Sequence, residues 1–350
     1  MKKTKLIYVH VGLSSFVKKD IAILSNEFEL VIFHFKLATK SRLPISFIAQ
    51  FFFLLRRIWS AKGLVIQFGG YQSYLPTRLG KWFGKKSIVI MGGTDSVSFP
   101  SIQYGCFHKK YLRFFTKMSL KRATLLLPVA ESIIKCDYTY TENDFPQQGY
   151  LFHAPKTKTQ NQTIYNGYDA SKWEPSNDKQ DNSFVTVAAD LSSRFGKKLK
   201  GIDMILEVAP KFPNCKFYIV GGNKLNETVP PNVILVENMA HEELPSFIAN
   251  KRFYLQLSMS EGFPNALCEA MLSGCIPIVS SVGAMPFIIG ETGYVLNKKD
   301  PDLLVKHINH ALESSSPELS MQARNRIAEA FPLSNRSSQL IGAIKQHLPN

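Results

Sequence analysis

Two carboxylates flank the segment Glu261-Gly-Phe-Pro-Asn-Ala-Leu-Cys-Glu269. Pro264 and Asn265 suit the first positions of a helix, so Glu261 falls in the loop before it and Glu269 in its first turns. The backbone N–H groups of residues 262–266 then surround a helix N-terminus, where phosphate or hydroxyl oxygens bind readily. A carboxylate on each side can accept hydrogen bonds from hydroxyl groups. This arrangement has the chemistry needed to bind a phosphorylated polyol.

Cations gather at a second expected helix start, Arg194-Phe-Gly-Lys-Lys-Leu-Lys200-Gly201. Arg194 and Lys200 can neutralise a diphosphate there, and the helix dipole adds to their effect. Lys197 and Lys198 fit solvated loop charges. Without the first segment, we would interpret the whole cluster as a basic surface loop.

Regular elements must position these residues, and the C-terminal half alternates strand and helix patterns. We expect strands at 184–188, 215–220, 233–236, 253–257 and 276–279, with helices at 201–209, 241–249 and 265–273, where Gly274 suits the position that follows the last helix. Repeated strand–helix–strand units predict a doubly wound parallel sheet, whose ligands bind beyond the carboxyl ends of the strands.

The nineteen residues from Glu261 to Val279 resemble the signature of glycosyltransferase family 4 (group 1), whose members are retaining enzymes with the GT-B fold. The resemblance implies that Glu261 contacts the donor sugar and that Glu269 holds the ribose hydroxyls. It also implies that Arg194 and Lys200 contact the donor diphosphate. The helix start would add further donor contacts, from Gly262, Phe263, Pro264, Asn265 and Ala266. If the two glutamates were an isolated pair, Glu269 would fit a solvated helix residue and the glycines would fit turn residues.

Weaker parts of the resemblance concern the nucleotide base and the domain entry. Gly222 ends an expected strand where the family has a glycine turn near the base, and Met239 after the next strand is a candidate for the base pocket or for the core. Tyr165-Asn-Gly-Tyr-Asp169 resembles the family's Asn-Gly-Val-Asp turn at the entry to the second domain, and we expect a structural role for it.

In the N-terminal half, Gly12 follows the first expected strand, where the family has a loop near the donor phosphate and the acceptor; a simple turn is the alternative. Met91-Gly-Gly-Thr-Asp95 resembles a family loop that often carries a catalytic His near its first position, where this chain has Gly92. No general base can therefore be named. Asp95 is the local candidate for a catalytic, acceptor or sugar contact, with helix capping as the alternative.

The N-terminal half repeats the α/β theme less regularly, with expected strands at 6–11, 30–34, 64–67, 87–91 and 124–127 and helices at 15–24, 44–59 and 74–82. The polar segment 155–162 reads as an interdomain link. We expect a GT-B architecture of two Rossmann-like domains facing a cleft: an acceptor-binding domain at 1–163 and a donor-binding domain at 164–332. Residues 325–348 fit one or two helices with a break at Pro332, and a helix at 333–350 would pack back on the first domain.

The excess of positive over negative charge is confined to the first half of the chain. Residues 1–165 hold 24 Lys/Arg and 8 Asp/Glu, whereas residues 166–350 hold 18 and 19. The first half should therefore face an anionic partner such as a membrane surface, a pyrophosphate-linked acceptor or a nucleic acid. The apolar run Leu43 to Leu55 is too short to span a bilayer, and it fits either a core helix or a surface that lies against lipid. We find no nucleic-acid-binding module.

Metal chemistry is not expected. Asp300-Pro-Asp302 has the form of a metal-binding Asp-x-Asp motif, but the helical run that follows it predicts an N-cap instead. The histidines show no ligand spacing. The five cysteines form no Cys-x-x-Cys pair, and we interpret them as reduced, mostly structural thiols of a cytoplasmic protein.

Together these features predict a metal-independent retaining glycosyltransferase that uses a UDP- or GDP-sugar and a saccharide or lipid-linked acceptor in surface polysaccharide or lipopolysaccharide synthesis. We expect it in the cytoplasm, peripherally at the inner face of the cytoplasmic membrane. A sugar-nucleotide epimerase or phosphorylase on the same fold is the alternative, and a non-catalytic nucleic-acid-binding protein is a weaker one.

Overall fold

The computed structural model describes residues 3–37, 42–188, 191, 196–221, 225 and 228–349. Arg194 and Gly222, both predicted to contact the donor, lie outside these ranges. The chain folds into two compact units. The first comprises residues 1–136, 147–166 and 334–350, and the second comprises residues 137–146 and 167–333. Residues 137–146, which the sequence analysis places in the first domain, thus belong to the second unit.

The first unit contains a six-stranded parallel sheet in the order β2-β1-β3-β4-β5-β8. Its strands are β1 (Thr4–His10), β2 (Phe28–His34), β3 (Gly63–Gln67), β4 (Lys86–Met91), β5 (Leu125–Pro128) and β8 (Gln160–Asn161). Because β8 pairs with β5, the interpretation of 155–162 as an interdomain link is wrong. The polar composition of this segment reflects a short edge strand, which is solvated on its outer side.

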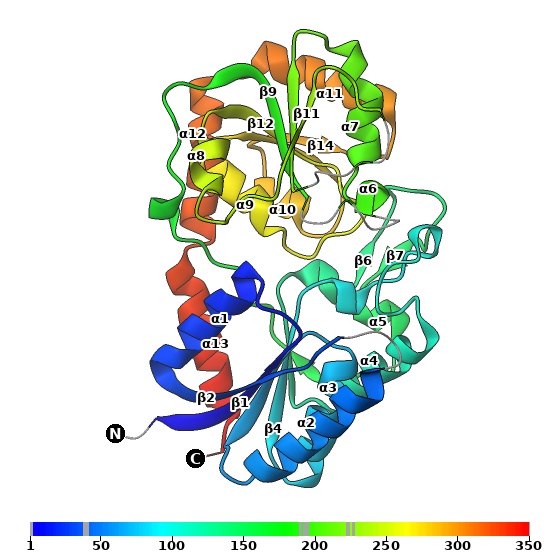
Figure 1. The fold of residues 1–350 in the computed structure, drawn as a ribbon, viewed down its shortest axis with the longest axis vertical. Helices are drawn as coiled ribbons and strands as arrows, with labels where there is room; N and C mark the ends of the chain where they lie inside the picture. The colour runs from blue at the N-terminus through cyan, green and yellow to red at the C-terminus, as the bar shows by residue number, and fades with distance from the viewer. Residues whose placement is uncertain are drawn as a thin grey trace. The chain divides into compact units, whose positions relative to one another are not determined.

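Helices cover both faces of this sheet (Figure 1). The larger ones are α1 (Ser15–Glu27), α2 (Leu43–Arg57), α3 (Tyr71–Trp82), α4 (Lys110–Arg122) and α13 (Leu333–His347), with a short α5 (Tyr150–His153). The connection from β1 to β2 runs in one direction across the sheet, and the connection from β2 to β3 runs in the other. Because both crossovers are right-handed, α1 and α2 lie on opposite faces of the sheet. Helices α2, α3 and α4 form one layer, and α1 and α13 pack together on the other face.

The second unit repeats this architecture, with strand order β11-β10-β9-β12-β13-β14. Its strands are β9 (Gln180–Val187), β10 (Lys216–Val220), β11 (Val233–Val236), β12 (Lys251–Gln256), β13 (Ile276–Ser280) and β14 (Tyr294–Leu296). Its helices are α6 (Gly196–Leu199), α7 (Ile202–Val208), α8 (Leu244–Ala249), α9 (Asn265–Leu272), α10 (Met285–Ile289), α11 (Pro301–Ser314) and α12 (Pro317–Ala330). A two-stranded pair, β6 (Cys136–Asp137) and β7 (Gln147–Gln148), completes the strands described. The α/β prediction of two doubly wound parallel sheets is confirmed.

Local signals set several helix ends as predicted. Gly274 follows α9 with a φ of 74°, a left-handed conformation that glycine adopts without strain. The Asp300 side chain accepts hydrogen bonds from the N–H groups of Asp302 and Leu303, which confirms the N-cap reading of that segment. Pro332 separates α12 from α13.

Helix α2 departs from the core-helix reading of residues 43–55. Gln50 and Leu54 are its buried residues, whereas Ile45, Ile48 and Phe52 are exposed. The helix therefore lies on the surface of the first unit. Within the described ranges, none of the helices combines the length and apolar character that crossing a lipid bilayer requires.

Candidate functional site

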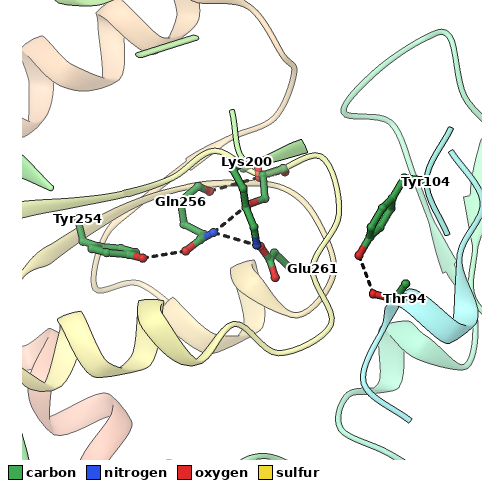
Figure 2. A network of polar contacts seen from close by, with 8 residues as sticks. Thr94, Tyr104, Lys200, Tyr254, Gln256 and Glu261 are labelled. Carbon is green, nitrogen blue, oxygen red and sulfur yellow. Dashed lines mark hydrogen bonds and ion pairs between the residues drawn. The ribbon is translucent and has the colours of Figure 1, made fainter. Parts of the chain in front are cut away.

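The topology of the second sheet brings the two predicted donor segments together. Strand order reverses at β9, because β10 and β11 extend the sheet on one side and β12 to β14 on the other. Such a reversal separates the connections that leave neighbouring strands and opens a binding site at their carboxyl ends. Lys200 lies in the connection after β9 and Glu261 in the loop after β12. Their ammonium and carboxylate groups meet, with 2.7 Å between Lys200 Nζ and Glu261 Oε1 (Figure 2).

A chain of polar side chains fixes the Glu261 carboxylate. Besides Lys200, Oε1 accepts from Ser258 Oγ at 2.8 Å and from Gln256 Nε2 at 3.2 Å. Gln256 Nε2 also lies 2.8 Å from Ser258 Oγ, and Gln256 Oε1 accepts from the Tyr254 hydroxyl at 3.0 Å. Among the described residues none bonds the second oxygen, Oε2. Within the described part of the chain, Glu261 is thus held through Oε1 alone.

Tyr254 determines which end of the Gln256 amide faces Glu261. Burial raises the pKa of Tyr254 well above its ordinary value, and the charges of Glu261 and Glu269 raise it further. The phenol therefore stays protonated and donates to the amide oxygen, so the amide nitrogen points toward the carboxylate. Residues 254, 256 and 258 occupy every second position of β12 and its extension, so their side chains lie on the same face of the strand.

Two glycines allow the loops around Lys200 and Glu261 to pack closely. Gly201 has a φ of 70°, and a Cβ on it would lie 2.2 Å from the carbonyl oxygen of Leu257. Gly283, with a φ of 61°, would place a Cβ 2.1 Å from the carbonyl oxygen of Glu261. No other residue fits either position without moving the loop after β12, since both the space and the left-handed backbone favour glycine.

Helix α9 begins at Asn265, as predicted, and carries Glu269 on a buried face. Glu269 Oε1 lies 3.1 Å from Nε2 of the half-exposed His241. The imidazole packs edge-on against Trp173, with ring centroids 5.5 Å apart. Glu269 is therefore a buried carboxylate beside a partly exposed histidine, and its contact with the ribose hydroxyls stays a prediction.

Other residues at the start of α9 have structural partners. The Asn265 side chain accepts from the hydroxyl of Tyr168 at 2.7 Å, and Phe263 packs between Tyr168 and Phe331. Tyr168 lies in the 165–169 turn. Gly262 and Pro264 are buried, whereas Ala266 is partly exposed. Of these residues, Phe263 thus contributes to an aromatic cluster, and its contact with the donor stays a prediction.

The remaining predicted donor residues lie near loops. Met239 follows β11 and is partly exposed, so it is not a core residue. Gly12 follows β1 in the first unit, and a Cβ there would meet open space. Packing therefore does not require glycine at position 12. Its role near phosphate stays a prediction, and that role would depend on the access that glycine gives to the backbone.

Asp95 in the first unit is completely buried. Its Oδ2 accepts from the N–H of Gly69 at 2.8 Å, and its Oδ1 accepts from those of Gly93 and Gly92 at 3.0 and 3.2 Å. Burial raises the pKa of this carboxyl to about 6, against the lowering effect of these backbone hydrogen bonds. The carboxylate joins the loops that follow β3 and β4. Asp95 thus does not cap the short helix Thr94–Ser96 that contains it, so the helix-capping alternative is not borne out. Its contact with the acceptor or sugar stays a prediction.

The ring of Phe68 fills the space that a side chain at position 92 would occupy. A Cβ on Gly92 would lie 2.1 Å from the Phe68 ring. Phe68 itself has a φ of 67°, which is rare for a bulky residue, and it packs edge-on against Phe16. In the same loop region, the Thr94 and Tyr104 hydroxyl oxygens lie 2.6 Å apart (Figure 2). Gly92 thus accommodates an aromatic ring where the related loop often has histidine.

Sequence reasoning missed four residues of the second-unit site: Tyr254, Gln256, Ser258 and His241. The first three had a signal, because polar residues at every second position near the end of an apolar strand point to one side of its carboxyl edge. His241 had none, since its contact with Glu269 joins residues 28 positions apart. Across the described parts of the chain, no group of three His, Cys, Asp or Glu side chains is arranged to hold a metal ion. No disulfide links the five cysteines.

The chain is similar in sequence and fold to known sugar-transferring enzymes. A family model for glycosyl transferases group 1 matches residues 171–330. The chain is 26% identical over 185 residues to a subunit of the phosphatidylinositol N-acetylglucosaminyltransferase of Arabidopsis thaliana, covering 48% of this chain and 40% of that protein. It is 32% identical over 105 residues to O-antigen chain mannosyltransferase B of Escherichia coli, covering 30% and 28%. The chain therefore spans less than half the length of these curated relatives.

Solved structures resemble the whole chain. Sucrose-phosphate synthase of Thermosynechococcus elongatus superposes with a TM-score of 0.78 at 14% identity, covering 98% of this chain and 99% of that one. Anabaena Alr3699/HepE, solved in complex with UDP and glucose, gives 0.70 at 12% identity with the same coverage. At such identities the likeness concerns the fold. The chain therefore has the GT-B fold, and its residues 171–330 match the family model for glycosyl transferases group 1.

Proposed function

We propose that the protein is a retaining glycosyltransferase that moves a hexose-type sugar from a UDP- or GDP-sugar to a saccharide or lipid-linked acceptor. The observation that carries the proposal is the Lys200–Glu261 pair at the point where strand order reverses, with Glu269 on the adjoining helix. This set supplies a cation for a diphosphate and two carboxylates for hydroxyl groups. The names of the relatives support transfer to a glycolipid or to an O-antigen chain, and the Anabaena complexes support UDP as the nucleotide.

Each residue would have a separate task in binding the donor. Lys200 would share its ammonium protons between Glu261 and a phosphate oxygen, which offsets the charge that grows on the leaving diphosphate. Glu261 would accept hydroxyl hydrogens of the sugar through Oε2, while Oε1 stays bonded to Ser258 and Gln256. Glu269 would hold the ribose hydroxyls. Because these groups are fixed before the donor arrives, they need no reorganisation during the reaction.

The proposed reaction needs no protein base. Gly92 has no side chain to act as one, and Asp95 is buried against three backbone N–H groups. The bond from the sugar C1 to the diphosphate oxygen breaks, and the acceptor oxygen bonds C1 on the same face. The acceptor proton passes to the departing diphosphate. We propose that this step is independent of metal ions, with Lys200 offsetting the diphosphate charge.

The setting we propose is surface polysaccharide or lipopolysaccharide synthesis in the cytoplasm, at the inner face of the cytoplasmic membrane. The excess of positive charge in the first half of the chain supports an anionic, membrane-associated acceptor. The first unit would then bind the acceptor and the second the donor.

A thermal-shift screen with UDP, GDP and their sugar conjugates tests the proposal. One nucleotide should raise the melting temperature of the wild type, because a ligand that binds the folded state stabilises it. Lys200→Ala and Glu269→Ala should each weaken that ligand about 10- to 100-fold, since each removes one or two charge-assisted hydrogen bonds. Lys211→Ala, which breaks an exposed ion pair with Asp302, is the matched control and should leave the shift unchanged. No stabilisation by any donor in the wild type would refute the proposal.

An epimerase or phosphorylase on the same fold would also bind a nucleotide sugar. Such an enzyme turns the donor over without a saccharide or lipid acceptor, whereas a transferase needs one. Donor consumption measured with and without membrane-extracted acceptor separates the two. A nucleic-acid-binding role predicts salt-sensitive affinity for oligonucleotides instead.

A further inference from the structure

Helix α2 has an inverted distribution of polarity. Its mid-helix polar residue, Gln50, is buried and donates from Nε2 to the backbone oxygen of Gln72 at 2.8 Å. Ile45, Ile48 and Phe52 follow one another at helical spacing, and their exposed fractions are 64%, 57% and 64%. A surface helix normally turns its apolar stripe to the core and its polar residues outward. A continuous outward apolar stripe indicates that something apolar covers it.

The neighbouring helices extend this surface with aromatic side chains. Trp59, just after α2, and Trp82, at the end of α3, are 68% and 65% exposed. Trp59 packs against Phe83 with ring centroids 4.8 Å apart, so the ends of the two helices are side by side. On α4, Tyr111 and Phe114 are exposed as well. Tryptophan and tyrosine favour the boundary between lipid and water, because each ring has an apolar body and a polar atom.

The charge of this layer has one sign. The segment from Lys36 to Ala130 contains sixteen Lys and Arg residues and a single acidic residue, Asp95, which is completely buried. Exposed cations flank the apolar stripe, among them Arg56 and Arg57 at the end of α2 and Lys110 and Arg113 on α4. An apolar surface surrounded by cations complements a bilayer whose headgroups are anionic.

We infer that the outer surface of α2, α3 and α4 binds the surface of an anionic lipid membrane. This lipid-facing surface is defined by Ile45, Ile48, Phe51, Phe52, Trp59, Trp82, Tyr111, Phe114 and the cations Arg42, Arg56, Arg57, Lys81, Lys110, Arg113 and Lys121. The layer occupies one face of the first sheet, as Figure 1 shows. The inference deepens the proposed function and rests on it for its biological setting. Its test needs no catalysis.

The surface fits lipid better than nucleic acid. Backbone phosphates would pair with the cations, but they offer nothing to exposed isoleucine side chains, and base stacking uses aromatic rings. Lipid headgroups bind the cations while the acyl region receives Ile45, Ile48 and Phe52. Insertion therefore accounts for both kinds of residue.

Tryptophan fluorescence provides a direct reading of insertion. The chain has three tryptophans, of which Trp59 and Trp82 lie on the lipid-facing surface, whereas Trp173 is 4% exposed and lies in the second unit. Vesicles of phosphatidylcholine with about one third phosphatidylglycerol should shift the emission to the blue and carry the full chain in flotation. Phosphatidylcholine vesicles should bind at least about tenfold more weakly. Trp173→Phe should retain the shift, and Trp59→Phe with Trp82→Phe should lose it.

Matched variants separate a local surface from a general effect of charge. Lys110→Gln, Arg113→Gln and Lys121→Gln together should weaken binding to the anionic vesicles about 100-fold, since each cation near such a surface contributes about fivefold. The control removes three exposed cations from the second unit, Lys172→Gln, Lys216→Gln and Lys306→Gln, and should change binding less than about threefold. Ile48→Ser should weaken binding about tenfold, whereas Met321→Ser, at a 48% exposed site of the second unit, should not.

Three outcomes would overturn the inference: equal losses in the two charge triples, tight oligonucleotide binding without vesicle binding, or self-association that Ile48→Ser abolishes while vesicles are ignored. The donor thermal shift reports on the proposed function separately. Vesicle binding without any donor shift would leave the lipid-facing surface established and the transferase proposal refuted. A donor shift without vesicle binding would refute the lipid-facing surface and leave the transferase proposal standing.

Discussion

Gly92 and Phe68 depend on each other in the loops that follow β4 and β3. Replacing Gly92 with Ala would drive a methyl group into the Phe68 ring, which lies 2.1 Å from the Cβ position. We expect Gly92→Ala to lower the free energy of unfolding of the first unit by about 1–3 kcal/mol, as overpacking of a filled site does. Urea denaturation of Gly92→Ala, of Phe68→Ala and of the variant that combines them measures this effect.

The double variant identifies the cause. Phe68→Ala removes the ring, so Gly92→Ala should cost about 1–2 kcal/mol less in that background than in the wild type. Additive effects would contradict a steric dependence between the two residues. Gly12→Ala is the control, because its Cβ meets open space, and it should change stability by less than about 0.5 kcal/mol.

The connection between β9 and α7 depends on one backbone conformation at Gly201. Alanine there would need a left-handed φ and would also collide with the carbonyl oxygen of Leu257. We expect Gly201→Ala to destabilise the second unit by about 2–4 kcal/mol and to weaken donor binding, because Lys200 would move with the loop. Denaturation and the donor thermal shift measure these effects.

A variant at Gly84 separates the cost of backbone strain from the cost of a steric collision. It also has a left-handed φ, of 63°, but a Cβ there would meet nothing within 4 Å. Gly84→Ala should therefore cost about 1–2 kcal/mol, from the backbone alone, and leave donor binding unchanged. If both variants cost the same, close packing against Leu257 does not determine the choice of residue at position 201.

Local sequence signals predicted the elements that carry the site, and contacts between distant segments determined the rest. The start of α9 was predictable because Pro264, Asn265 and Gly274 each have a preference for one helix position. Gln256 was not predictable as a partner of Glu261, because its role requires the loop after β12 to fold back on the strand edge.

Helix α4 went unpredicted, and the exposure of α2 was left open. In α4, Lys110, Arg113, Lys117 and Lys121 recur at helical spacing, so a signal for an amphipathic helix was present in the sequence and was missed. Helix α2 is apolar on nearly every side, and a sequence cannot tell which side of such a helix the protein covers. Its position in the fold decides this.

At the scale of the molecule, one buried ion pair joins the start and the end of the chain. Arg336 on α13 donates from Nε and Nη2 to Asp20 on α1, each at 2.7 Å, and both side chains are buried. Arg336→Ala should destabilise the first unit by about 3–5 kcal/mol, because it leaves a buried carboxylate without its partner. Urea denaturation checks this value.

A second pair on the same two helices is the control. Lys345 and Glu27 also join α13 to α1, but both are about half exposed. Lys345→Ala should cost less than about 1 kcal/mol, since water and salt screen an exposed pair. Asp20→Asn combined with Arg336→Leu should recover part of the loss. An equal cost for the two alanine variants would show that burial of the charges is not the cause.

The division of the chain into units has a consequence for its synthesis. The first unit needs residues 334–350, which a ribosome makes after the second unit, and the partner of Asp20 lies 316 positions downstream. Domains usually fold in the order in which they emerge. Here the unit that emerges first is the one completed last, after the second unit has already been translated. A nascent chain stalled before α13 should therefore contain a protease-resistant second unit and a first unit that is still cleaved.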